Sequence, residues 1–169
     1  DPRAAFEKGH IITPPRTFVL GDTNNTWSDC DVIVEGRADT AGQEHLYLET
    51  QISLVIPGER ENFKIYSSTQ NPTSVQKMAA RVLGIQMNSI EVEVLRLGGA
   101  FGGKEEQGNT WASLAVLGSY KIKRPVKLSL PRAEDMVMTG KRHPYTSDFK
   151  MGLKKDGTII AYEVNFYQN

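Results

Sequence analysis

The sequence predicts an α+β fold, in which two main helices pack on a mixed or antiparallel sheet that contains hairpins. Apolar and polar residues alternate at 51–58 and again at 62–67, and the polar turn between these runs indicates a β-hairpin. Residues 72–83 place apolar side chains at helical spacing. Asp156-Gly157 separates two further alternating runs, and this dipeptide is a strong signal for a second hairpin.

The first main helix has a start signal and a stop signal. Asn71 is a favourable N-cap residue, and Pro72 suits the first helical position. Gly84 is typical of the residue that follows a helix. One face of this helix is apolar and carries Val75, Met78, Ala79, Val82 and Leu83.

Shorter patterns predict the remaining elements. In chain order they are a strand at 31–36, a strand at 90–94, an apolar helix at 109–121, a strand at 126–130 and a short helical turn at 131–135. Prolines, glycines and polar residues dominate residues 1–29, which we interpret as a linker or extended arm, whereas 30–169 forms the domain. Arg132 and Asp135 belong to a charged cluster that we expect to form surface or interdomain ion pairs.

Charge and hydropathy exclude several kinds of partner. The 169 residues include 20 Lys and Arg and 20 Asp and Glu, so the net charge is zero. A nucleic-acid-binding surface or a polybasic membrane anchor would normally produce a basic excess. No stretch approaches the roughly 20 apolar residues that a transmembrane helix needs. We therefore expect neither nucleic acid nor a membrane as a partner.

The single cysteine, Cys30, limits the redox chemistry of the chain. One cysteine forms no internal disulfide and cannot hold an iron–sulfur cluster by itself. Its neighbours Asp29 and Asp31 disfavour the thiolate that a catalytic cysteine needs. We expect a reduced, cytoplasmic protein in which Cys30 has no catalytic role.

Residues 98–103 form a glycine-rich segment between a predicted strand and a predicted helix. Together with Lys104 they match the spacing of a phosphate-binding P-loop. Glu105, however, stands where that motif needs Ser or Thr for the magnesium ion, and a carboxylate there repels phosphates. Ala100 likewise breaks the dinucleotide-binding pattern Gly-x-Gly-x-x-Gly. The segment is either a ligand-binding loop of another kind or a tight strand–helix turn without a ligand.

Four separated motifs in order carry a family resemblance: GQEHLYLET, SSTQNP, LGGAFGGKEE and PRAEDMVMTGKRHP. Together they resemble the molybdenum hydroxylases, in the molybdopterin-binding large subunit or domain of xanthine dehydrogenases and aldehyde oxidases. The resemblance covers residues 42–169 and is closest to xanthine dehydrogenase. It implies that 30–169 is the N-terminal part of a truncated molybdopterin-binding domain, and that 1–29 leads from a preceding domain.

The resemblance also assigns roles to individual residues. Gln70 matches a glutamine that hydrogen-bonds an oxo ligand of molybdenum, and Phe101 and Gly102 match loop positions beside the metal and the pterin. Glu105 matches a glutamate that orients a purine substrate. Each residue has a simpler interpretation: a loop amide for Gln70, a core aromatic for Phe101 and a first-turn helix acid for Glu105. Because molybdenum is held through the pterin, we expect no protein ligand to the metal.

The activity implied by the resemblance is oxidation of a purine, xanthine or hypoxanthine, with water as the oxygen source. Electrons then pass through iron–sulfur clusters to FAD on other domains or subunits. We expect no catalytic residue within 1–169, so the isolated piece is predicted to be inactive, to bind no cofactor and to self-associate through exposed strand edges. Its other expected partners are the heterocyclic substrate and the rest of the enzyme. The alternatives are a related hydroxylase acting on aldehydes or other N-heterocycles, and a cofactor-free binding module of the same fold.

Overall fold

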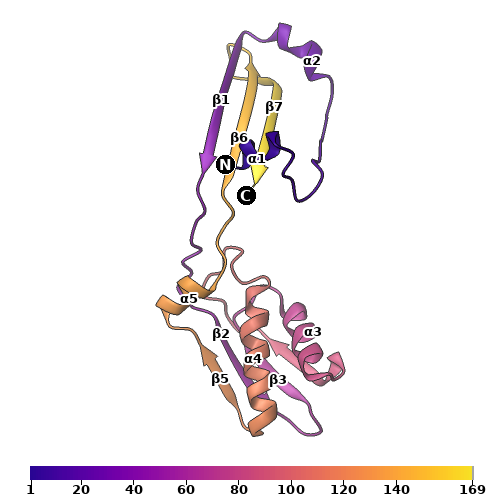
Figure 1. Ribbon diagram of the computed structural model, residues 1–169, viewed down its shortest axis with the longest axis vertical. Coiled ribbons are helices and arrows are strands. Elements are labelled where there is room, and N and C mark those ends of the chain that lie inside the picture. Colours follow the sequence, from indigo (N-terminus) through magenta and orange to yellow (C-terminus); the bar gives the residue numbers. More distant parts are fainter. Residues whose placement is uncertain (169) are drawn as a thin grey trace. The chain divides into compact units, whose positions relative to one another are not determined.

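The computed structural model describes residues 1–168 and confirms the α+β fold, with one antiparallel and one mixed sheet (Figure 1). The chain divides into two compact units. One unit combines residues 1–43 with the segment from His143 onward, and the other comprises 44–142. The chain passes between the units at Gln43/Glu44 and at Arg142/His143. The division into 1–29 and 30–169 stays a prediction.

The first unit contains an antiparallel sheet with the strand order β1-β6-β7. Its strands are β1 (Val32–Thr40), β6 (Tyr145–Leu153) and β7 (Ile159–Gln168). The Asp156-Gly157 turn joins β6 to β7, which confirms the second predicted hairpin. The strand expected at 31–36 extends further, because its residues pair with β6 as far as Thr40.

Residues 1–29 contain three short helical segments: α1 (Pro2–Glu7), α2 (Thr23–Thr26) and the 3₁₀ turn η1 (Trp27–Asp29). Arg3 donates from its Nε to Asp148 of β6 at 2.8 Å, and its guanidinium also forms an ion pair with that carboxylate. This contact attaches the start of the chain to the sheet of its own unit. The role of this segment as a connection from a preceding domain stays a prediction.

The second unit contains a four-stranded sheet with the order β4-β3-β2-β5. The strands are β2 (Ile52–Pro57), β3 (Phe63–Ser67), β4 (Ile90–Glu93) and β5 (Val126–Ser129). β2 and β3 form the first predicted hairpin, and β4 runs parallel to β3 because a helix connects them. The strands expected at 90–94 and 126–130 are present.

Two helices pack together on this sheet, as predicted: α3 (Pro72–Leu83) and α4 (Gln107–Ile122) (Figure 1). The Asn71 side chain accepts a hydrogen bond from the Ser74 N–H at 3.0 Å, and Gly84 ends α3 in the left-handed conformation. α4 begins two residues before the predicted start. The turn η2 (Met87–Ser89) precedes β4, and α5 (Arg132–Met138) extends the predicted turn at 131–135.

The apolar core of this unit lies between the sheet and the two helices. Its buried residues are Val55, Phe63, Ile65, Val75, Ala79, Ala80, Ile90, Ala112, Ala115 and Val116. Phe63 and Ile65 of β3 and Val75 and Ala79 of α3 come from the faces that the sequence pattern indicates. Met78 and Val82 of the expected helix face are instead exposed. β2 buries Val55, on the face opposite to the apolar residues that alternate there. Within residues 1–168, no helix is both long and apolar enough to cross a membrane.

Candidate functional site

The glycine-rich segment is a tight loop between β4 and α4. The backbone φ angle is positive at Gly99 (+89°), Phe101 (+53°) and Gly102 (+87°). A positive φ is uncommon for a residue with a side chain, so Phe101 is held in a constrained conformation. The residue is 75% exposed. Phe101 is therefore not a core aromatic in this structure, and the simpler interpretation of this residue is wrong.

Two glycines let this loop lie directly against the segment before β2. A Cβ atom at Gly98 would stand 2.5 Å from the Cβ of Glu49. At Gly103 it would stand 2.7 Å from the His45 ring and 2.9 Å from the Tyr47 ring. No side chain fits at these distances, so the close packing requires glycine. At Gly102 an added Cβ would meet nothing within 4 Å.

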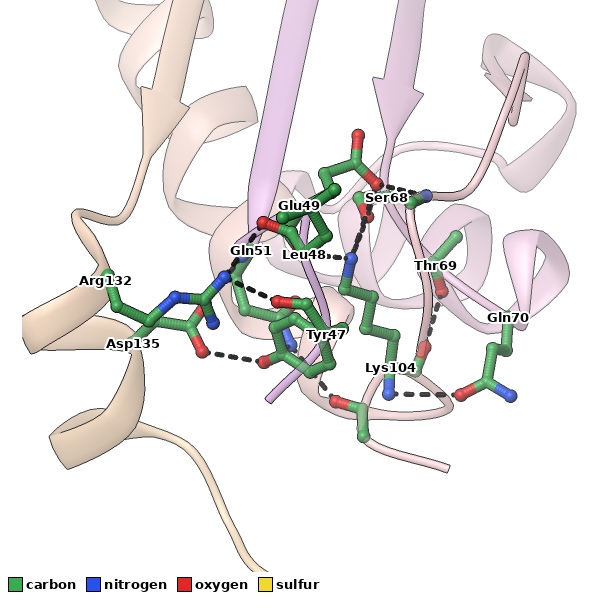
Figure 2. Close-up of polar contacts among 12 residues, drawn as sticks. Tyr47, Leu48, Glu49, Gln51, Ser68, Thr69, Gln70, Lys104, Arg132 and Asp135 are labelled. Carbon is green, nitrogen blue, oxygen red and sulfur yellow. Dashed lines mark hydrogen bonds and ion pairs between the residues drawn. The ribbon is translucent and has the colours of Figure 1, made fainter. Parts of the chain in front are cut away.

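Gln70 is attached to the loop through both its backbone and its side chain. Its N–H donates to the carbonyl of Lys104 at 2.9 Å, and its Oε1 accepts from the Lys104 N–H at 3.2 Å. These bonds settle the orientation of the amide: the oxygen is used, and the Nε2 group, which Figure 2 shows pointing away, is left as a donor. The loop-amide interpretation thus accounts for the oxygen of Gln70 and not for its nitrogen.

Glu105 is exposed and lies just before α4. The N-cap of α4 is Glu106, and the first turn of the helix contains no acidic residue. The interpretation of Glu105 as a first-turn helix acid is therefore wrong. Its carboxylate forms no hydrogen bond or ion pair with any residue in the described part of the chain, which leaves it available to a ligand.

Lys104 lies in the same loop but is completely buried. Its ammonium donates to the Ser68 hydroxyl at 2.6 Å, to the Glu49 carbonyl at 2.7 Å and to the Glu49 carboxylate at 3.3 Å (Figure 2). It also lies 4.3 Å from the centre of the Tyr47 ring. Burial lowers the pKa of Lys104, and the negative charge of Glu49 opposes this shift.

Glu49 is the common acceptor of this arrangement. Its Oε2 accepts from Ser68 at 2.6 Å and from the Gly98 N–H at 3.0 Å, in addition to Lys104. Partial burial alone would raise the pKa of Glu49, but these hydrogen bonds and the Lys104 charge outweigh burial and lower it. The first glycine of the loop is thereby attached to a carboxylate that stays ionised.

A second group of hydrogen bonds holds the loop from the side of α5. The Tyr47 hydroxyl donates to Asp135 at 2.8 Å, and the Gln51 N–H donates to the same carboxylate at 2.7 Å. The Gln51 side chain donates to the Gly103 carbonyl at 3.1 Å, and Arg132 donates to the Leu48 carbonyl at 2.8 Å. Burial raises the pKa of the Tyr47 hydroxyl, and its bond to Asp135 adds to this.

We call these connected residues the polar anchor: Tyr47, Glu49, Gln51, Ser68, Lys104 and Asp135. The expectation of surface or interdomain ion pairs for the charged cluster is wrong for Asp135, which is 1% exposed and accepts hydrogen bonds from Tyr47 and Gln51 of its own unit. The sequence places Lys104 directly after two glycines, and this pattern indicates a phosphate-loop spacing but no structural role for the lysine. Nothing in the local pattern indicated its burial.

The loop on this anchor can receive a ligand rich in acceptor atoms. The N–H groups of Phe101 and Gly102 donate to no acceptor among residues 1–168, and the Gln70 amide adds a third free donor. Such donors suit oxo and phosphate groups, and the open space at Gly102 permits close approach. No cluster of three or more potential metal ligands occurs in the described part of the chain. What the loop offers a bound group is a set of hydrogen-bond donors.

This combination of fold and loop defines a cofactor-binding domain. The chain belongs to the molybdopterin cofactor-binding domain family, whose family model matches residues 6–169. This finding confirms the resemblance to molybdenum hydroxylases that the four motifs carry.

Relatives and solved structures agree with this assignment. The chain is 39% identical to a xanthine dehydrogenase/oxidase of Gallus gallus and 40% identical to aldehyde oxidase 1 of Oryctolagus cuniculus. Each match covers 98% of this chain and 12% of the relative, so the chain spans about an eighth of their length. The aldehyde oxidoreductase of Desulfovibrio gigas superposes with a TM-score of 0.71 at 27% identity, over 86% of this chain and 16% of that one.

Proposed function

We propose that this chain is part of a molybdopterin-dependent hydroxylase that oxidises a purine such as xanthine or hypoxanthine. Water supplies the oxygen atom, and the electrons leave through iron–sulfur clusters to FAD on other domains or subunits. Family membership supports the cofactor. The similarity to xanthine dehydrogenases and to aldehyde oxidases is equally strong, so the purine assignment is supported by Glu105 instead.

The observation that carries the cofactor site is the orientation of Gln70. Because its oxygen is occupied by the Lys104 N–H, its NH₂ group is presented as a donor. We infer that this donor holds an oxo ligand of the bound cofactor, and a neutral amide does so without titrating. The N–H groups of Phe101 and Gly102 complete the donor surface. The cofactor, when bound, supplies the redox chemistry, and the protein supplies binding and orientation.

Glu105 has the chemistry that purine recognition needs. A carboxylate accepts hydrogen bonds from ring N–H groups, and its protonated form donates to ring nitrogens or carbonyl oxygens. An aldehyde offers no such ring atoms. With no partner in the described part of the chain, Glu105 can contact substrate without first breaking an internal bond.

The test compares Glu105→Val with wild type in the full-length enzyme, using xanthine and an aromatic aldehyde as substrates. We expect kcat/KM for xanthine to fall by about 10-fold or more, as for the loss of a hydrogen bond to a charged group, with little change for the aldehyde. Glu106→Val is the matched control, because Glu106 is also exposed and its side chain makes no capping bond. Equal losses for both substrates contradict the purine assignment.

An aldehyde or another N-heterocycle remains the alternative substrate class, favoured by the similarity to aldehyde oxidase 1 and to the aldehyde oxidoreductase. A wild-type enzyme that oxidises the aldehyde but not xanthine would support it. The second alternative, a binding module without cofactor, is separated by metal analysis of the full-length protein from a host that makes molybdopterin. Absence of molybdenum there overturns the proposed hydroxylase.

A further inference from the structure

We propose that Lys104 is a positioning residue, whose buried ammonium fixes the loop at 98–106 so that the ligand-facing groups keep a single arrangement. The proposal rests on the proposed function for the roles of Gln70 and Glu105. It extends that function because Lys104 itself touches no ligand: its side chain is completely buried.

The head of Lys104 has no free donor. An ammonium group has three N–H bonds, and three acceptors surround it: the Ser68 hydroxyl and two oxygens of Glu49. These acceptors belong to the segment before β2 and to the residue directly after β3, so the side chain joins the loop to both. Figure 2 shows the ammonium enclosed between these partners. A catalytic or ligand-binding role of the ammonium is therefore excluded.

The backbone of the same residue orients Gln70. The Lys104 N–H holds the Gln70 Oε1, and the Lys104 carbonyl accepts from the Gln70 N–H and from the Thr69 hydroxyl at 3.0 Å. Glu105 follows Lys104 directly in the chain, and Gly102 is only two residues before it. All the proposed ligand-facing groups are thus bonded to Lys104 or within three residues of it.

Packing alone does not explain a lysine at this position. A methionine fills a similar volume without the cost of burying a charge, which is large unless hydrogen bonds and a counter-charge compensate for it. What the lysine adds is three directed bonds to fixed acceptors. Two of these bonds go to Glu49, one to its carbonyl and one to its carboxylate. The Glu49 carboxylate also binds the Gly98 N–H, so both ends of the glycine-rich segment are attached to Glu49.

The experiment measures amide hydrogen exchange and kinetics of Lys104→Met in the full-length enzyme. Without cofactor, we expect peptides covering 98–106 to exchange about 10-fold faster than in wild type, while peptides in α3 keep their rates. With cofactor, kcat per bound molybdenum falls by about 10-fold or more, as for other residues that orient a metal site. Lys64→Met is the matched control, because Lys64 pairs with Glu91 and Glu93 on an exposed part of the same unit.

Ser68→Ala is the second variant and covers the case in which Lys104→Met fails to fold. It removes one of three acceptors and leaves the Glu49 pair, so the same changes should appear at reduced size. A merely structural role of Lys104 would lower the yield and the melting temperature but leave kcat per molybdenum unchanged. Loop exchange or kcat per molybdenum within about twofold of the Lys64→Met control overturns the proposal.

Failure of this proposal and failure of the proposed function give different results. Exchange of the loop is measured without cofactor or substrate, so it reports on Lys104 alone. If the xanthine preference does not depend on Glu105, the purine assignment fails while the exchange result still decides the role of Lys104. If Lys104→Met behaves like the control, the positioning role fails and the substrate assignment stands.

Discussion

The apolar core and the polar anchor lie in the same compact unit but hold it together in different ways. The core joins the sheet to α3 and α4 through contacts that have no required direction. The anchor joins four segments (residues 47–51, Ser68, the loop and α5) through directed bonds to the carboxylates of Glu49 and Asp135. One side-chain atom of the anchor lacks such a bond: the Gln51 Oε1 is buried but accepts no hydrogen bond from residues 1–168. The core thus holds whole elements, whereas the anchor sets the conformation of one loop.

Gly103→Ala tests directly whether the anchor sets the conformation of the loop, and we expect it to have the largest effect on the site. The new Cβ would overlap the rings of His45 and Tyr47, so the loop must move away from the anchor. We expect molybdenum content of the full-length enzyme to fall by about 10-fold or more, measured per folded chain.

Gly84→Ala is the matched control for that change. Gly84 ends α3 at a φ of +68° and has open space around it, so alanine adds strain without a collision. Its cost of about 1 kcal/mol should leave the molybdenum content unchanged. Equal loss of molybdenum in both variants would show that loop and core are not separate.

The same distinction explains how much could be predicted from the sequence. Core elements follow from local periods: α3 from its cap, its apolar face and Gly84, and the β2–β3 hairpin from alternation. The anchor has no period, because most of its bonds join residues that are distant in the sequence, such as Lys104 with Ser68, 36 positions apart, and Tyr47 with Asp135, 88 positions apart. Charged residues are also rarely buried, so the local pattern predicts that Lys104 and Asp135 are exposed, although both are buried.

The candidate site could be predicted only through the family resemblance. Residue chemistry alone left Gln70, Phe101 and Glu105 with simpler interpretations, of which the structure removes those of Phe101 and Glu105. What decides these cases is exposure and backbone conformation, and both depend on packing of distant segments. The helical segments at 1–29 were missed for a related reason: the sequence there is rich in Pro, Gly and polar residues, which locally indicates a linker.

A core substitution of intermediate effect sharpens the comparison from the other side. Ile65→Ala removes a completely buried side chain from β3 and should lower the free energy of local unfolding by about 2–5 kcal/mol. Hydrogen exchange in β3 and α3 measures this loss. Because Ile65 contributes nothing to the anchor, kcat per bound molybdenum should stay at the wild-type value. A fall in kcat per molybdenum similar to that of Lys104→Met would contradict the separation.

The smallest expected effect comes from acid, through Glu49. The hydrogen bonds to Ser68 and Gly98 and the charge of Lys104 outweigh partial burial, so the pKa of Glu49 lies below its ordinary value of 4.5 in the folded protein. The folded state therefore binds this proton more weakly than the unfolded state does. The resulting stabilisation is complete above pH 4.5 and is lost as the pH falls through the lowered pKa.

Loop exchange, corrected for the intrinsic effect of pH, should accordingly lose protection at 98–106 in this acid range. Exchange in α3 should change less, because its core contacts carry no charge. Glu49→Gln removes the titrating group and should flatten the acid response of the loop. An unchanged acid response in Glu49→Gln would contradict the assignment of this response to Glu49.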